Sequence, residues 1–166
     1  MKKQGFTLIE LMVVIVIMGI LAAVAVPKLF GMIAKSKASE IGPAAGEYVK
    51  LQDAFISETG TTYGSWKFIG YTMNDNSVFD YSEEHFTAGA ADTDVLGTAT
   101  EVWKAQPKAN LNDCTSADGY WELKIKQSTV AGDNGAQYEA HVKGDDCNVL
   151  TPGYGKLDAT GAAQVD

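Results

Sequence analysis

The chain has 166 residues, a hydrophobic content of 46% and a formal net charge of −8, which fits one domain with a modest core rather than two domains. All 13 basic residues are lysines, against 21 acidic residues. An acidic chain without arginine argues against a dedicated nucleic-acid-binding protein, which needs clustered positive charge facing the phosphates. We therefore expect no nucleic-acid partner.

The chain opens with two lysines and then an apolar run from Phe6 to Val26. Three residues interrupt this run: Thr7, Glu10 and Gly19. As a helix the run is roughly 31 Å long, close to the thickness of the hydrocarbon core of a bilayer. Because lysines favour the cytoplasmic side, we expect a single-pass precursor with its N-terminus in the cytoplasm and everything after residue 26 outside.

A secretory signal peptide is the simpler interpretation of this segment. Ala23-Val24-Ala25 fits a small-x-small cleavage site, and cleavage after Ala25 would release a soluble exported protein, for example a binding protein. Against this stands Glu10, because a carboxylate inside an apolar run costs about 2.5–3.5 kcal/mol on insertion scales. A segment that serves only export has no use for such a group, so an intramembrane acid is assumed to be functional and to have a partner.

The stretch GFTLIE, from Gly5 to Glu10, followed by an apolar helix, resembles the N-terminus of type IV pilins and of their pseudopilin relatives. The signature of that family is a short basic leader that ends in Gly, an aromatic residue, and Glu as the fifth residue of the mature chain. Glu10 is the fifth residue after Gly5. Gly19 and Pro27 also fall where such pilins often carry helix-loosening residues.

The resemblance implies a mechanism. A prepilin peptidase would cut between Gly5 and Phe6, where glycine lets the backbone enter a tight site. The new amine on Phe6, usually N-methylated in this family, is mostly charged near neutral pH. It is the natural partner of Glu10, in the same subunit or in a neighbour, because their attraction is strong at low dielectric. The implied partners are further copies of the chain in a helical filament, the peptidase and the inner-membrane assembly machinery.

Residues 28–59 continue the helix as an amphipathic half. Its apolar side chains recur at spacings of three and four, which places them on one helix face: Ile41, Ala44, Ala45, Tyr48, Leu51 and Phe55. Gly60 is a plausible end of the helix. Pro27 and Pro43 each remove a backbone hydrogen bond, so kinks or local unwinding are expected there. In filaments of the family, helicity tends to be lost between the positions that match Gly19 and Pro27.

Residues 60–166 are expected to form a globular β domain, which makes the chain an α+β protein. Tyr120–Lys126 and Ala136–Lys143 alternate apolar and polar residues, as half-buried strands do, and the linker GDNG predicts a hairpin. Weaker strand predictions fall on Ser65–Tyr71, Thr98–Ala105 and Asn148–Leu150, with a long loop between the first two. The resulting antiparallel sheet would pack on the stripe of Tyr48, Leu51 and Phe55.

The two cysteines, Cys114 and Cys147, flank the predicted hairpin. A hairpin brings its outer ends together, so the sulfurs could meet, and pairing is the expectation for an exported chain. Pilins often carry a disulfide that encloses a C-terminal region, and this spacing looks similar, although 19 residues follow Cys147. Two unpaired buried thiols are the alternative.

Catalytic motifs are weak in this chain. The two histidines, His85 and His141, have no zinc-ligand spacing, and no phosphate-binding loop is present. Four acids lie in loop-forming sequence, where calcium binding is conceivable, but none matches an EF-hand: Asp75, Asp133, Asp145 and Asp146. We therefore expect a protein that is not an enzyme and holds neither cofactor nor metal. Four aromatic residues could contact glycans if exposed, although core packing is the expected role of most: Trp66, Tyr81, Trp103 and Tyr154.

The leading functional hypothesis is a structural subunit of an extracellular type IV pilus that serves adhesion or motility. A type II secretion pseudopilin, which builds a short periplasmic filament, is the nearest alternative. The expected domains are a leader at residues 1–5, a transmembrane and filament-core helix at 6–27, the amphipathic half at 28–59 and the globular domain at 60–166.

Overall fold

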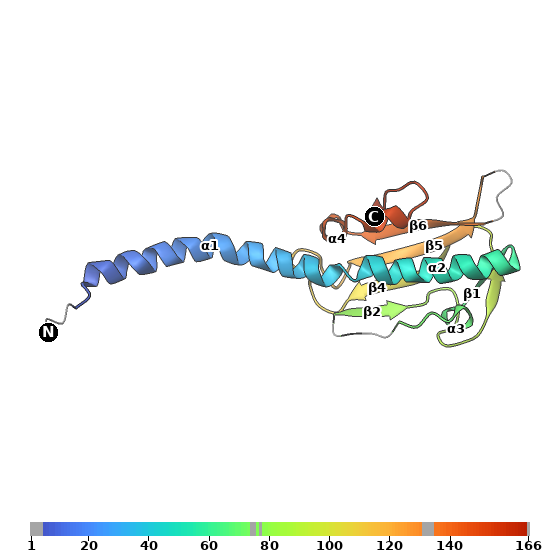
Figure 1. Ribbon diagram of the computed structural model, residues 1–166, viewed down its shortest axis with the longest axis horizontal. Coiled ribbons are helices and arrows are strands. Elements are labelled where there is room, and N and C mark those ends of the chain that lie inside the picture. The colour runs from blue at the N-terminus through green and yellow to red at the C-terminus, as the bar shows by residue number, and fades with distance from the viewer. Residues whose placement is uncertain (1–4, 74–75, 77, 131–134, 166) are drawn as a thin grey trace.

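A long helical segment runs from Leu8 to Thr59 with one break. The computed structural model describes residues 5–73, 76, 78–130 and 135–165, and in it α1 spans Leu8–Ala38 and α2 spans Ile41–Thr59. Figure 1 shows α1 extending away from the rest of the molecule, whereas α2 lies along the sheet. Pro43 lies just after the break, where its nitrogen cannot donate to the Ser39 carbonyl four residues earlier and its ring crowds that carbonyl.

A five-stranded sheet forms the centre of the head. Its strands, in spatial order, are β2 (Phe79–Ser82), β4 (Thr100–Pro107), β5 (Tyr120–Gln127), β6 (Ala136–Lys143) and β7 (Gln164–Val165). The predicted hairpin is confirmed, since β5 and β6 pair antiparallel along their whole length; residues 131–134 of its turn lie outside the described part of the chain. The sheet is mixed, because the short β7 runs parallel to β6. The α+β architecture follows the expectation.

The segment between residues 60 and 98 differs from the prediction. The predicted strand Ser65–Tyr71 is wrong: the short helix α3 (Trp66–Ile69) lies there, ended by Gly70 in the left-handed conformation at φ +74°. The expected long loop holds two short strands, β2 and β3 (Thr93–Val95), and β3 pairs with β1 (Thr62–Gly64). Phe79 and Tyr81 of β2 are buried while Asp80 and Ser82 are exposed, an alternation too short to stand out in the sequence.

The predicted strand at Asn148–Leu150 is also wrong, because this segment is the end of helix α4 (Asp145–Leu150). Gly144, at φ +90°, turns the chain directly after β6. Asp145 and Asp146 then occupy the first helical turn, where negative charge is favoured by the helix dipole. The 3-10 helix η1 (Tyr154–Leu157) follows and leads to β7.

The core lies between α2 and one face of the sheet. The alternation in β5 and β6 is confirmed, since the predicted apolar residues are buried: Trp121, Leu123, Ile125, Tyr138, Ala140 and Val142. On α2 the prediction is right in its first half only: Tyr48 is buried, but Leu51 and Phe55 are only partly buried. Gln52 and Ile56 occupy the buried face instead, so the buried residues in the second half of α2 are not those of the predicted apolar stripe.

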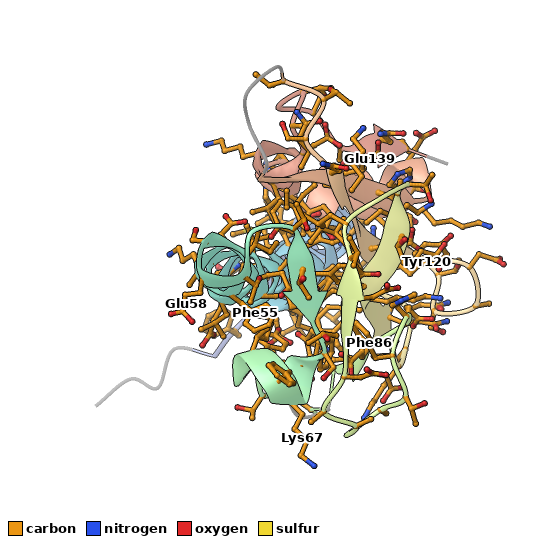
Figure 2. All side chains as sticks on the ribbon, turned by 90° about the vertical axis from the view of Figure 1, so that its right-hand side faces the viewer. Phe55, Glu58, Lys67, Phe86, Tyr120 and Glu139 are labelled. Carbon is orange, nitrogen blue, oxygen red and sulfur yellow. A yellow bond between two sulfur atoms is a disulfide. The ribbon has the colours of Figure 1, made fainter. Side chains whose placement is uncertain are left out.

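The opposite face of the sheet carries acidic and basic side chains of β5 and β6. Glu122 on β5 pairs across the strands with His141 on β6, and both are buried. The Lys124 Nζ atom lies 3.3 Å from a Glu122 carboxylate oxygen, and Lys126 Nζ lies 2.5 Å from Glu139. Figure 2, seen from the end of the head away from α1, shows Glu139 and Tyr120 on this side of the molecule.

Candidate assembly site

The N-terminal helix presents an uncovered apolar surface. Every Val, Leu, Ile, Met and Phe side chain from Leu8 to Ile33 is at least 42% exposed in the single chain. Leu8–Thr59 is the one helical segment among the described residues that is long and apolar enough to cross a membrane, and its most apolar part is unburied. An uncovered apolar surface of this extent needs lipid or other protein around it.

Glu10 closes the N-terminus of this helix together with Thr7. The Glu10 carboxylate accepts hydrogen bonds from the Thr7 N–H at 2.8 Å and from the Thr7 hydroxyl at 2.7 Å. The Thr7 hydroxyl oxygen accepts the Glu10 N–H at 3.3 Å. This reciprocal capping box satisfies two backbone donors that a helix end leaves open. Thr7 is therefore a partner of Glu10 within the subunit, which our sequence reasoning did not identify although the Thr-x-x-Glu spacing was visible.

Gly5 and Phe6 precede the helix. Residues 5–7 have no helical structure, and Phe6 is 87% exposed. A Cβ atom added to Gly5 would meet no heavy atom within 4 Å. The peptide bond between Gly5 and Phe6 therefore lies in open, non-helical backbone, the conformation a protease needs to bind a chain.

The three predicted helix-loosening residues differ in their setting. Gly19 and Pro27 lie inside α1, which is continuously helical through both. Pro43 lies in the first turn of α2, next to the break at Ser39 and Glu40. Loss of helicity between Gly19 and Pro27 in an assembled filament stays a prediction.

The predicted disulfide is present. Cys114 and Cys147 are joined, with their Cα atoms 4.7 Å apart, and both are almost fully buried. The bond ties the loop before β5 to α4, so it lies at the end of the head that adjoins α1, with which α4 is in contact.

The two histidines considered in the sequence analysis each lie near a carboxylate. His85 contacts Asp94 at 2.8 Å, and His141 lies 3.8 Å from Glu139. No group of three metal-ligating side chains occurs among the residues that the structure describes. Of the four acids considered for calcium, Asp75 and Asp133 lie outside that part of the chain.

Comparison with known proteins decides the family. The family described as "Prokaryotic N-terminal methylation motif" matches residues 1–26. The type IV major alpha-pilin of Moraxella bovis is 32% identical over 144 residues, which cover 78% of this chain and 89% of that protein. The chain belongs to the type IV pilin family.

Two other relatives of this pilin match over a shorter length. The type IV major pilin protein PilA of Myxococcus xanthus is 35% identical over 98 residues, 59% of this chain and 43% of the relative. A type IV major fimbrial protein FimA of Dichelobacter nodosus is 36% identical over 91 residues, 55% of this chain and 54% of the relative. The matched part of the pilin thus spans about half the length of these two relatives. No solved structure matched the chain.

Membership of this family supports the interpretation that the chain is a structural subunit of a pilus and that its precursor is anchored in a membrane. It also offers an explanation for the uncovered apolar surface of α1, since assembly into a filament of pilin subunits would cover that surface. The relatives are structural proteins rather than enzymes.

Proposed function

We propose that this pilin is made as a single-pass inner-membrane precursor, cleaved between Gly5 and Phe6, N-methylated on Phe6 and polymerised through α1 into an extracellular pilus for adhesion or motility. In this proposal residues 1–5 are the leader and 6–27 the filament-core helix. Residues 28–59 join that helix to the head, and residues 60–166 are the head that coats the filament. The prepilin peptidase and the inner-membrane assembly machinery are the partners of the precursor.

The capping box at Thr7 and Glu10 is the observation that carries the proposal. Its two hydrogen bonds hold the Glu10 carboxylate at the helix N-terminus, next to the position where cleavage would create the Phe6 amine. In the apolar surroundings of packed α1 helices an ammonium and a carboxylate attract strongly, and an unpaired carboxylate is penalised. Subunits in which the amine faces a carboxylate are therefore selected during assembly.

Two substitutions separate the charge of Glu10 from its capping role. Glu10→Gln keeps an oxygen that can accept from Thr7 but removes the charge, so we expect normal cleavage and loss of filaments. Thr7→Val removes the hydroxyl but keeps the charge, so we expect filaments to persist. Glu58→Gln, an exposed acid at the end of α2, is the control and should assemble as the native chain does.

The measurement is intact mass and N-terminal sequence of the precursor and of sheared surface filaments. A mature chain that begins with methylated Phe6 and dominates the filaments supports the proposal. A mature N-terminus at Val26 would instead indicate a secreted soluble protein. Filaments found only in the periplasm would indicate a pseudopilin, and normal assembly of Glu10→Gln would contradict the role of the charge.

A further inference from the structure

A cavity of about 610 Å³ opens in the head, lined by residues between Trp66 and Gly89. Its walls come from α3, from the turn that follows α3, from the end of β2 and from the loop after β2. In Figure 1, α3 lies at the end of the head far from the N-terminus. No lining residue belongs to α1, so contacts between α1 helices would not by themselves fill this cavity.

Aromatic side chains form one part of the lining, and internal hydrogen bonds fix them. The Trp66 indole donates to the Val102 carbonyl at 3.2 Å, and its ring meets that of Tyr71 edge-on at 4.9 Å between centroids. Tyr71 donates its hydroxyl to the Ala44 carbonyl of α2 at 3.1 Å. Tyr81 donates to the Glu40 carboxylate at 2.6 Å. Side chains held in this way lose little conformational freedom when a ligand binds.

The aromatic residues that line the cavity differ in how far they are exposed. Tyr71 and Tyr81 are buried, whereas Trp66 is only partly buried. Trp103 and Tyr154, the other two aromatics considered for surface contacts, are at most 1% exposed and belong to the core. Trp66 is therefore the aromatic side chain of this group that offers a ligand the most surface.

The polar groups of the cavity carry opposite charges. Lys67 and Glu83 both line it, and so does Thr72, whose hydroxyl is uncharged. One oxygen of the Glu83 carboxylate accepts the Trp66 N–H at 2.5 Å, which holds the carboxylate beside the aromatic wall. Burial raises the pKa of Glu83. Figure 2 shows Lys67 reaching outward from α3.

We propose that this cavity binds a neutral saccharide, with one sugar ring against Trp66 and its hydroxyls bonded to Glu83, Lys67 and Thr72. The apolar C–H face of a pyranose stacks on an aromatic ring, while its hydroxyls both donate and accept. A ligand with a net charge of either sign is repelled by one of these two groups, whereas the hydroxyls of a neutral polyhydroxylated ligand can donate to Glu83 and accept from Lys67. The cavity volume lies within the range of small-molecule sites.

The test titrates the full chain, unassembled in polyoxyethylene detergent micelles, with neutral oligosaccharides. Detergents with sugar headgroups are avoided because they would compete. Cellohexaose, maltohexaose and chitohexaose are the probes, and a heparin hexasaccharide is the charged comparison. Binding is followed by tryptophan fluorescence and by saturation-transfer NMR. Saturable binding of at least one neutral probe, with weaker or no binding of the charged one, is expected. Since the chain is not assembled, this result is independent of whether it forms filaments.

Three variants connect binding to the cavity. Trp66→Ala should raise the Kd about tenfold or more, because it removes the stacking surface. Glu83→Gln retains an acceptor for the Trp66 N–H and should raise the Kd severalfold without loss of fold. Phe68→Ala is the matched control: Phe68 is an aromatic residue on the same short helix, 50% exposed, but it does not line the cavity. Its Kd should equal that of the native chain.

Several results would overturn the proposal. One is the absence of binding of all neutral probes to the native chain. Another is a Kd that stays the same in both Glu83→Gln and a Trp66→Ala protein whose thermal unfolding shows it to be folded. A third is protection of Trp66 and Lys67 from chemical labelling in assembled filaments, which would show that a second copy of the chain occupies the cavity.

Discussion

Gln52 is a polar residue on the buried face of α2. It is fully buried, and its amide group donates to the Tyr48 hydroxyl at 2.9 Å and to the Gly64 carbonyl at 2.8 Å. Its side-chain oxygen accepts the Gly64 N–H at 3.1 Å. The side chain thus pairs with both backbone groups of one residue, as a neighbouring strand would, and fixes β1 against α2.

Replacing Gln52 by Leu should destabilise the head by about 2–4 kcal/mol, because two buried backbone groups of Gly64 lose their partner. Chemical unfolding of the full chain in micelles, followed by tryptophan fluorescence, measures this loss. Glu58→Leu, an exposed substitution on the same helix, should change the unfolding free energy by no more than about 0.5 kcal/mol. Equal effects of the two substitutions would show that the Gln52 contacts contribute nothing.

Glu122 gives the head a dependence on pH. Burial raises the pKa of Glu122 and the nearby Glu101 charge adds to this, while Lys124 and His141 oppose it. A raised pKa means that the folded head binds this proton more tightly than the unfolded chain does. The stability that comes from this proton is present below the ordinary pKa of a glutamate and is lost as the pH rises through the raised pKa.

Glu122→Gln resembles the protonated side chain at every pH. We expect the variant to melt at a higher temperature than the native chain at pH 7.5, and the difference to shrink as the pH falls towards about 4, where the native glutamate is protonated. Calorimetry at a series of pH values measures it. Glu58→Gln controls for the loss of a surface charge. A difference in melting temperature that grows on acidification would reverse the sign and refute the argument.

At the level of elements, the two prolines of the long helical segment differ in whether the helix continues past them. Pro27 is accommodated inside a continuous α1, whereas the helix breaks next to Pro43. Contacts at the break distinguish them: Glu40 accepts hydrogen bonds from Tyr81 and Asn76, each at 2.6 Å. These contacts tie the junction between the two helices to the head, whereas Pro27 is exposed in the single chain.

Substituting each proline by alanine should therefore show two local effects. Pro43→Ala supplies an amide that can donate to the Ser39 carbonyl, so α1 and α2 should join and the amide at position 43 should become protected from hydrogen exchange. Pro27→Ala should protect the amide at position 27 and leave exchange around residues 39–43 unchanged. Rapid exchange at position 43 in the first variant would show that the Glu40 contacts, rather than the proline, cause the break.

At the scale of the whole molecule, the disulfide holds the end of the head next to α1. It joins the loop before β5 to α4 across 33 residues of sequence. Gly119 is required beside it, since an added Cβ would lie 2.5 Å from the Cys147 sulfur and 2.6 Å from the Thr115 carbonyl oxygen. The loop thus wraps closely around the bond.

Replacing both cysteines by alanine should lower the stability by about 3–4 kcal/mol, from the loop-closure entropy regained by the unfolded chain. For a chain of this length that corresponds to a fall in melting temperature of about 10 °C, measured by calorimetry. Gly119→Ala should destabilise the native chain more than it destabilises the double cysteine variant, where the sulfur is gone. Equal costs in both backgrounds would show that the sulfur does not restrict this position.

Several features of this pilin could be predicted because contiguous residues encode them. The GFTLIE stretch indicated the family, and the apolar run after it predicted a helix that the head leaves uncovered. The strict alternation in Tyr120–Lys126 and Ala136–Lys143 placed both strands and the inner face of the sheet. The two cysteines flanking this hairpin could be paired, because antiparallel pairing brings its ends together.

The remaining features could not be predicted, because they depend on contacts between residues far apart in the chain. The burial of Gln52 could not be predicted, since it depends on hydrogen bonds to the Gly64 backbone twelve residues away as well as on the one to Tyr48. The helices at residues 66–69 and 145–150 are too short to show a periodicity, and each adjoins a glycine at positive φ, Gly70 after the first and Gly144 before the second. The cavity exists because Trp66, Tyr71 and Tyr81 are anchored to Val102, Ala44 and Glu40, and such long-range anchoring leaves no pattern in the segment that it shapes.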